Sequence, residues 1–385
     1  MNWFSFMGGR SFAAGVLTPR RKGAKARREK TKTELLRRTA RVGFNSRISF
    51  PLCGFAAWRL GVKKVGPPLL IALALAFAAT AHAETNATQP TVIVLVGAAG
   101  EEDFGKVFIE SAAAWQKAAE KAEANFTQIG GTDAQATNDL AEFRLALGRE
   151  AKTNAAELWL VLLGHGTFDG KEAKFNLRGP DLSASVLSNL LAGFQRPVAI
   201  INTASASAPF LKALSATNRV VITATRSGAE ENYARLGKFI SEAISDPEAD
   251  LDKDGQVSLL ETFLTGSRRV AEFYQNDGRL ATEHALLDDN GDGLGTPADW
   301  FRGLRAVKTP AQAGAVDGMR AHQWHLIRSV NDQKLTVEQH RQRDALELEI
   351  LQLRRMKATM REEDYYQKLE ALLTKLAEIE LAGQR

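Results

Sequence analysis

Carboxylates recur at alternate positions in one short stretch of this chain, which is the spacing that binds a hard cation. Gly255 allows the sharp turn that such a loop needs, and Val257 supplies an apolar residue that anchors it. Helical patterns flank the stretch at 234–244 and 259–274. We therefore expect a Ca²⁺ site here. The predicted ligands are Asp250, Asp252, Asp254, the carbonyl of Gln256, Ser258 through a water and a bidentate Glu261.

A second acidic stretch, residues 288–299, repeats part of this spacing. Both stretches resemble the EF-hand loop, and the first fills every key position of it. In the second, Gly295 stands where the apolar anchor belongs and Pro297 stiffens the end of the loop, so a degenerate calcium site and a Gly-rich turn both remain open. Its candidate ligands are Asp288, Asn290, Asp292 and Asp299.

Two apolar runs, 158–163 and 198–201, each end in a short polar cluster. Apolar runs that are bounded by Gly or Pro and alternate with helical patterns predict buried parallel strands. Ligands bind outside the carboxyl ends of such strands, so His165 and Ser205 should face one crevice. The amide of Gly166 would then be available to line an oxyanion hole.

These motifs resemble the caspase-like cysteine peptidases, with legumain as the nearest in character. The His-Gly pair matches their histidine motif, and residues 204–208 lie over their Ala-Cys-x-Ser-Gly motif with Ser205 in the cysteine position. Residues 230–234, Glu-Glu-Asn-Tyr-Ala, are similar to the legumain stretch that follows the nucleophile. The resemblance covers roughly residues 90–245. It implies an α/β fold of three αβα layers with a mostly parallel sheet.

A serine in the cysteine position changes the expected chemistry. A hydroxyl is a poor nucleophile unless a base lies within hydrogen-bond reach and a third group orients that base. No orienting group for His165 stands out, since Asp169 and Glu172 follow it on a loop. A one-residue shift in the alignment with the nucleophile motif would also put Ala204 at the nucleophile position. We favour a calcium-binding pseudopeptidase that binds a peptide or protein partner. A Ser205/His165 hydrolase and a scaffold protein acting through its C-terminal helices remain the alternatives.

Charge separates a basic leader from an acidic remainder. Residues 1–64 hold 16 of the 50 Lys and Arg residues and 2 of the 45 Asp and Glu residues, and residues 65–83 hold none. From residue 84 onward 34 basic and 43 acidic residues remain, a net charge of −9, which argues against nucleic-acid binding. The same part of the chain has no cysteine, because Cys53 is the only one.

The leader has the three parts of a signal peptide. Lys63-Lys64, the apolar run 69–79 and Ala81-His82-Ala83 follow one another, which predicts cleavage after Ala83 and export to the periplasm or beyond. The apolar run is shorter than the roughly 20 residues of a spanning helix, so no stable membrane span is expected after cleavage. Residues 1–61 are either the result of a translation start assigned too far upstream or a genuine basic extension.

The expected domains are a leader (1–83, with the signal peptide at 62–83), a caspase-like domain (90–307, with the EF-hand-like segment at 235–300) and a helical hairpin (319–385). Thr336 and Gln339 form a capping box, although one continuous helix is possible because no Gly or Pro divides the region. Glu283 is expected to cap or pack near the second acidic stretch. His322 and His325 are expected to form a helix-surface pair, since no carboxylate is near them in sequence. Strands are expected at 91–96, 125–129, 158–163, 198–201 and 219–226, and further helices at 104–122 and 133–149.

Overall fold

The computed structural model describes residues 89–131, 138–308 and 316–384, so the predicted leader lies outside the described residues. Its centre is a seven-stranded sheet in the order β10-β9-β8-β7-β3-β1-β2. The five strands from β2 to β8 are parallel, and β9 and β10 each run antiparallel to their neighbour. The strands are β1 (Thr91–Val96), β2 (Asn125–Ile129), β3 (Leu158–Leu163), β7 (Val198–Asn202), β8 (Arg219–Thr223), β9 (Leu286–Asp288) and β10 (Thr296–Pro297).

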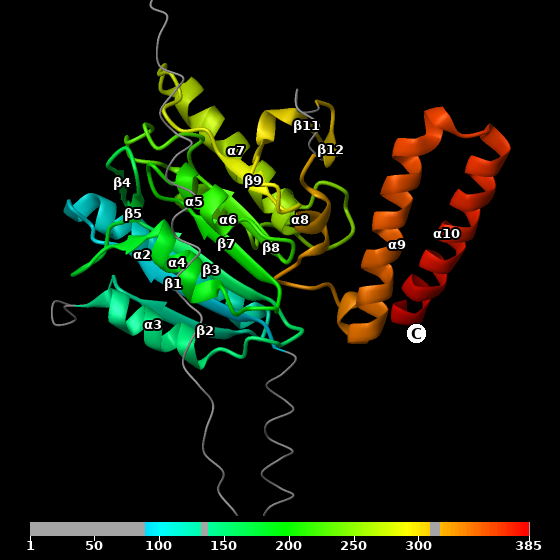
Figure 1. Ribbon diagram of the computed structural model, residues 1–385, viewed down its shortest axis with the longest axis horizontal. Coiled ribbons are helices and arrows are strands. Elements are labelled where there is room, and N and C mark those ends of the chain that lie inside the picture. Colours follow the sequence, from blue (N-terminus) through cyan, green and yellow to red (C-terminus); the bar gives the residue numbers. More distant parts are fainter. Residues whose placement is uncertain (1–88, 132–137, 309–315, 385) are drawn as a thin grey trace, which may run out of the picture. The chain divides into compact units, whose positions relative to one another are not determined.

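Helices cover both faces of this sheet, which confirms the predicted three-layer α/β fold (Figure 1). Successive side chains of a strand point to opposite faces, so Trp159 and Val161 join one core while Leu158 and Leu160 join the other. Both sets are buried, which explains the continuous apolar runs. The first face is covered by α2 (Glu102–Lys121), α6 (Leu236–Ala243) and α7 (Leu259–Asn276), the second by α3 (Asp139–Arg149), α4 (Ala184–Leu191) and α5 (Ala208–Leu214).

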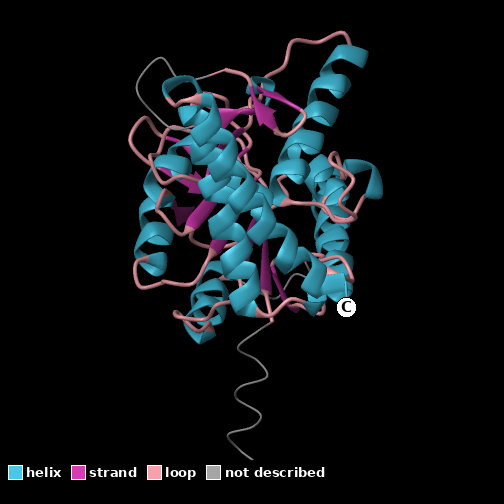
Figure 2. Cartoon of the chain, turned by 90° about the vertical axis from the view of Figure 1, so that its right-hand side faces the viewer, coloured by secondary structure: helices cyan, strands magenta, loops and turns pink. Residues whose placement is uncertain are grey.

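Helix α2 shows how the sequence fixes this packing. Phe108, Ala112, Trp115 and Ala119 recur at helical spacing and are all buried against the sheet. Figure 2 shows the magenta strands between and behind such cyan helices. A stripe of small and aromatic residues therefore lets α2 lie close to β1 and β3.

Two small sheets extend the domain beyond the main one. Strands β4 (Gly166–Phe168), β5 (Ala173–Phe175) and β6 (Leu182–Ser183) form an antiparallel sheet that starts directly after His165. Strands β11 (Phe301–Arg302) and β12 (Arg305–Ala306) pair with each other. The 3-10 turn η2 (Pro247–Ala249) precedes the first acidic loop, and η3 (Ala298–Trp300) includes the end of the second acidic stretch.

The chain ends in two packed helices, α9 (Val337–Met356) and α10 (Glu362–Gln384), orange and red in Figure 1. The capping box of Thr336 and Gln339 starts α9 as predicted, and the 3-10 turn η5 (Lys357–Thr359) breaks the region into a hairpin in place of one continuous helix. Before it, α8 (Met319–Gln323) and η4 (Asp332–Lys334) lie in a segment that contributes Ala321, Trp324 and Leu326 to the core of the α/β domain. Among the described helices, none is both long and apolar enough to cross a membrane.

Candidate functional site

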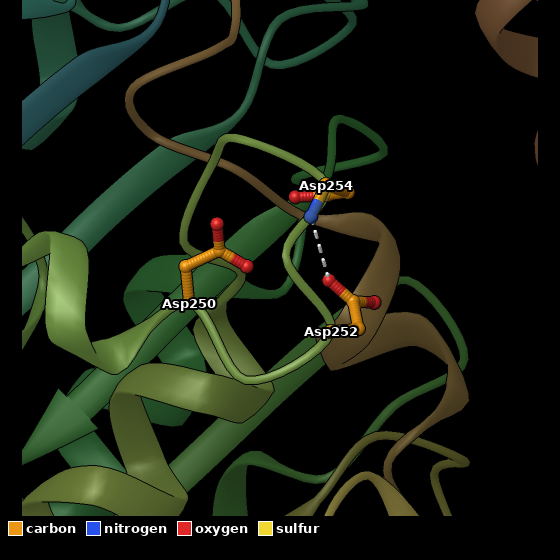
Figure 3. Close-up of side chains that lie close together, drawn as sticks. All are labelled: Asp250, Asp252 and Asp254. Atoms are coloured by element: carbon orange, nitrogen blue, oxygen red, sulfur yellow. Dashed lines mark hydrogen bonds between the residues drawn. The ribbon is translucent and has the colours of Figure 1, made fainter.

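The first acidic loop connects η2 to α7 and gathers three carboxylates. Ligand oxygens of Asp250, Asp252 and Asp254 lie within 4.8 Å of one another, and Figure 3 shows the three side chains around one loop. The Asp250 carboxylate accepts hydrogen bonds from the amides of Lys253 (2.6 Å) and Gly255 (3.1 Å). Both of those residues have positive φ, +63° and +89°, so the backbone curls around the carboxylates. The donor set is all oxygen, which fits a hard cation such as Ca²⁺.

The end of the loop is held by Glu261. Its carboxylate accepts from the Leu251 amide at 2.7 Å and from the amide and hydroxyl of Ser258, both at 2.8 Å, so that Ser258 and Glu261 form the capping box of α7. Burial and neighbouring carboxylates raise the pKa of Asp252, and burial is the main cause that raises the pKa of Asp254. A bound cation would relieve this repulsion.

The partner of this loop was not predicted. Ser258 forms an isolated antiparallel bridge with His325, and the Leu259 amide donates to the Trp324 carbonyl at 2.8 Å. The side-chain oxygen of Gln256 also accepts from the Ser329 amide at 3.0 Å. The loop therefore packs against residues 324–329, a segment before the hairpin that is distant from the loop in sequence.

The second acidic loop repeats the turn geometry of the first. Asp288 accepts from the amides of Gly291 and Gly293, both at 3.0 Å, which are the same relative positions that Asp250 uses. However, this loop follows strand β9, and Asp299 bonds to Lys308 Nζ at 2.6 Å with its side chain 69% exposed. In this loop the side chains of Asp288, Asn290 and Asp292 each accept from backbone amides of the turn, whereas Asp299 is bonded to a lysine.

At the carboxyl edge of the sheet, the Ser205 hydroxyl contacts the residue after His165. It donates to the Gly166 carbonyl at 3.0 Å and accepts from the Gly166 amide at 3.2 Å, and Ser205 is 3% exposed. His165 Nε2 lies 3.1 Å from the Ala99 carbonyl, and since a carbonyl only accepts, this nitrogen carries the proton. Neither bond joins the imidazole to the hydroxyl.

The turn after β7 is tied to its neighbours by further buried hydroxyls. Ser207 Oγ accepts from the amides of Ala224 (3.1 Å) and Thr225 (3.3 Å) and lies 3.2 Å from the Thr225 hydroxyl. Ala206 has a φ of +51°, a conformation that costs an ordinary residue about 1 kcal/mol, and its amide donates to the Glu230 carbonyl at 2.8 Å. Hydrogen bonds therefore tie Ser205, Ala206 and Ser207 to β4 and to residues 224–230, whereas the buried Nδ2 of Asn202, at the start of the cluster, has no partner among the described residues.

An aromatic box surrounds His165. Its ring makes edge contacts with Phe104, Phe108 and Tyr233 at centroid distances of 5.0, 5.3 and 5.7 Å. Burial raises the pKa of Tyr233 to about 12, so the phenol stays neutral. These three residues were not predicted as site residues. Tyr233 could have been inferred because it follows β8 and must lie at the same sheet edge.

A cavity of about 680 Å³ opens beside this box at the end of β1. The ends of β1 and β3 pack closely against the segment after His165, since a Cβ on Gly97 would lie 2.6 Å from the Asn176 carbonyl oxygen and one on Gly164 would lie 2.9 Å from the Phe175 ring. The cavity walls mix apolar and charged side chains, namely Val96, Phe108, Ile109, Lys106, Glu102 and Arg178. The wall therefore offers both apolar contacts and charges of either sign.

No protein-family model matches the sequence, and no curated protein matches it. Among solved structures, the chain is similar to a protein from Geobacter sulfurreducens, with a TM-score of 0.34 and 13% identity over 52% of this chain and 92% of that one. It is also similar to caspase-1 from Spodoptera frugiperda, with a TM-score of 0.34 and 10% identity over 53% of this chain and 87% of that one.

Proposed function

We propose that this chain is an exported, calcium-binding protein of caspase-like fold that has no peptidase activity and binds a peptide or protein partner. The bond pair between Ser205 and Gly166 carries this proposal. A nucleophilic serine needs its hydroxyl proton directed at a base, whereas here that proton is donated to a backbone carbonyl. The imidazole of His165 donates its Nε2 proton to the Ala99 carbonyl.

Calcium has a structural role in this proposal. The loop at 250–261 joins η2 to α7 and is docked on residues 324–329, so a cation held by Asp250, Asp252, Asp254 and Glu261 would stiffen the junction between the α/β domain and the segment before the hairpin. To bind bidentately, Glu261 would have to exchange backbone donors for the ion. No step of a reaction depends on this ion.

The test of inactivity is chemical labelling of the full chain. A serine-directed fluorophosphonate probe is expected to leave Ser205 unmodified, and a library of peptide substrates is expected to stay uncleaved. Labelling at Ser205 that disappears in a His165→Ala variant would refute the proposal and establish the hydrolase alternative. Ser205→Ala supplies the background signal.

The test of peptide binding uses the cavity beside β1. Ile109 lines this cavity and is 37% exposed, so Ile109→Asp should weaken the binding of fluorescent peptides selected from a library. Leu145 is also exposed but lies on α3, and Leu145→Asp is the matched control. Equal loss in both variants, or no loss in Ile109→Asp, would contradict a site in this cavity.

A scaffold function through the hairpin is the second candidate, and one observation favours it. Helices α9 and α10 leave large apolar side chains exposed, among them Leu348, Tyr366, Leu373 and Leu381. A protein partner that binds wild-type chain but not a Leu373→Glu, Leu381→Glu variant, while ignoring Ile109→Asp, would assign partner binding to the hairpin.

A further inference from the structure

A second cavity, of about 310 Å³, lies between the first acidic loop, the segment after α8 and the hairpin; we call it the histidine cavity. Its lining includes the side chains His322, His325, Asp254, Arg343, Glu347 and Glu380. The two histidines lie three positions apart in the sequence, whereas the carboxylates come from the first acidic loop (Asp254), from α9 (Glu347) and from α10 (Glu380). The fold therefore supplies the carboxylates that are missing from the sequence around the histidine pair.

The imidazoles in this cavity are short of hydrogen-bond partners. His325 is 6% exposed, and its Nε2 is buried without a partner. His322 Nδ1 is also buried without a partner. Buried polar atoms in native proteins are nearly always satisfied by protein, water or a ligand, and both residues that carry these two nitrogens line the histidine cavity.

The charge of the cavity selects a cation. Arg343 is already paired with Asp332, whereas Glu347 and Glu380 bring negative charge and Glu347 accepts a bond from Gln323 at 2.9 Å. His322 Nε2 lies 3.7 Å from a carboxylate oxygen of Asp252. Burial raises the pKa of Glu380, Arg343 lowers it, and the nearby charges of Asp332, Glu347 and Asp254 raise it. An anion would be repelled by this lining.

We infer that the histidine cavity binds a divalent transition-metal ion of the Zn²⁺ class through His322 and His325, with Glu347 and Glu380 as carboxylate ligands. Imidazole together with carboxylate is the donor set that Zn²⁺ uses, whereas Ca²⁺ takes oxygen alone. Among the described residues, only Asp250, Asp252 and Asp254 form a group of three whose ligand atoms all lie within 4.8 Å of one another. Binding of the ion in the histidine cavity would therefore draw the side chains of Glu347 and Glu380 toward the two imidazoles. The site is separate from the calcium loop but shares its wall at Asp254.

The experiment is a Co²⁺ titration of the full chain in Ca²⁺-containing buffer, followed by the visible absorption of bound Co²⁺. We expect one Co²⁺ per chain, displaced by Zn²⁺ and not by added Ca²⁺. His322→Gln and His325→Gln should each weaken Co²⁺ binding about tenfold or more, and Glu380→Gln severalfold. His284→Gln is the matched control, because that imidazole bonds to Glu230 at 2.7 Å, outside this cavity.

Two results would overturn the inference: no Co²⁺ uptake by the wild-type chain, or uptake that both histidine variants retain. If Asp250→Asn abolishes the retained uptake, the ion lies in the first acidic loop. Melting temperatures measured without metal show whether His325→Gln still folds. If it does not, Glu380→Gln on the surface helix α10 decides the question.

Discussion

The Ser205 hydroxyl and the Gly166 backbone form a reciprocal pair, with a donated bond of 3.0 Å and an accepted bond of 3.2 Å. This pair joins the turn after β7 to the start of β4, so the residue in the expected nucleophile position fastens two segments of the sheet edge. A hydroxyl that makes these two bonds stabilises the fold and is not directed at a catalytic base.

The first prediction concerns that contribution. Ser205→Ala leaves the buried Gly166 amide without its acceptor, and we expect the free energy of unfolding to fall by about 2 kcal/mol in denaturant titrations. Ser227, whose exposed hydroxyl accepts from the Ala229 amide, is the control, and Ser227→Ala should change it by less than about 0.5 kcal/mol. A wild-type midpoint for Ser205→Ala would show that the pair has no structural role.

The second prediction compares two glycines. A Cβ on Gly166 would lie 2.3 Å from the Ser205 carbonyl oxygen, a backbone atom that cannot move aside, so Gly166→Ala should cost about 3 kcal/mol or more. Gly148 lies in α3 with open space around its Cβ position, and Gly148→Ala should stabilise the chain by about 0.5–1 kcal/mol. Unfolding curves of the two variants are expected to shift in opposite directions, and a shared direction would contradict this account.

The central strands could be predicted closely because they are apolar runs bounded by Gly, Pro or a polar cluster. β1, β2 and β3 have the predicted bounds, while the strand expected at 219–226 ends at Thr223, where the chain turns to bond Ser207. The helix expected at 133–149 begins at Asp139 in the described residues, with Asn138 as its cap. Strands of two or three residues, such as those of the β4–β5–β6 sheet, have too few side chains to give a pattern.

The surroundings of the sites were harder to predict than their residues. Spacing identified the acidic loop because its carboxylates lie at alternate positions in the sequence. The bridge from Ser258 to His325 and the carboxylates around His322 depend on contacts between segments that are far apart in the chain. Glu283 was expected to cap or pack near the second acidic stretch, but its carboxylate caps the start of α6, 47 residues away in sequence.

The third prediction concerns Ca²⁺. For an extracellular-type site with a Kd of about 10⁻⁴–10⁻³ M, about 10 mM Ca²⁺ should raise the free energy of unfolding by about 1.4–2.7 kcal/mol. Asp252→Asn removes one carboxylate of the cluster and should abolish most of this increment. Asp299→Asn should retain it, since Asp299 bonds to Lys308. Thermal melts with Ca²⁺ and with a chelator measure both. An increment that is absent in wild type, or unchanged in Asp252→Asn, would exclude the loop as the site.

The fourth prediction concerns pH and Glu283. This buried carboxylate accepts from the amides of Arg235 (2.8 Å) and Leu236 (3.1 Å) at the start of α6, and burial raises its pKa above the ordinary 4.5. The folded state therefore binds the proton more tightly than the unfolded state does. Its contribution to the free energy of unfolding is full below the unfolded pKa and decreases as the pH rises through the folded pKa. Glu283→Gln, which cannot ionise, should lack this decrease.

A variant of Tyr274 distinguishes the titration of Glu283 from a nonspecific effect of pH on stability. Its hydroxyl donates to Glu283 at 3.2 Å and holds the pKa of the carboxyl down against burial. Tyr274→Phe should raise that pKa further, so the decrease in the free energy of unfolding should extend to higher pH than in wild type. Denaturant titrations at a series of pH values measure the three chains. If wild type and Glu283→Gln lose stability in parallel as the pH rises, another group must be responsible.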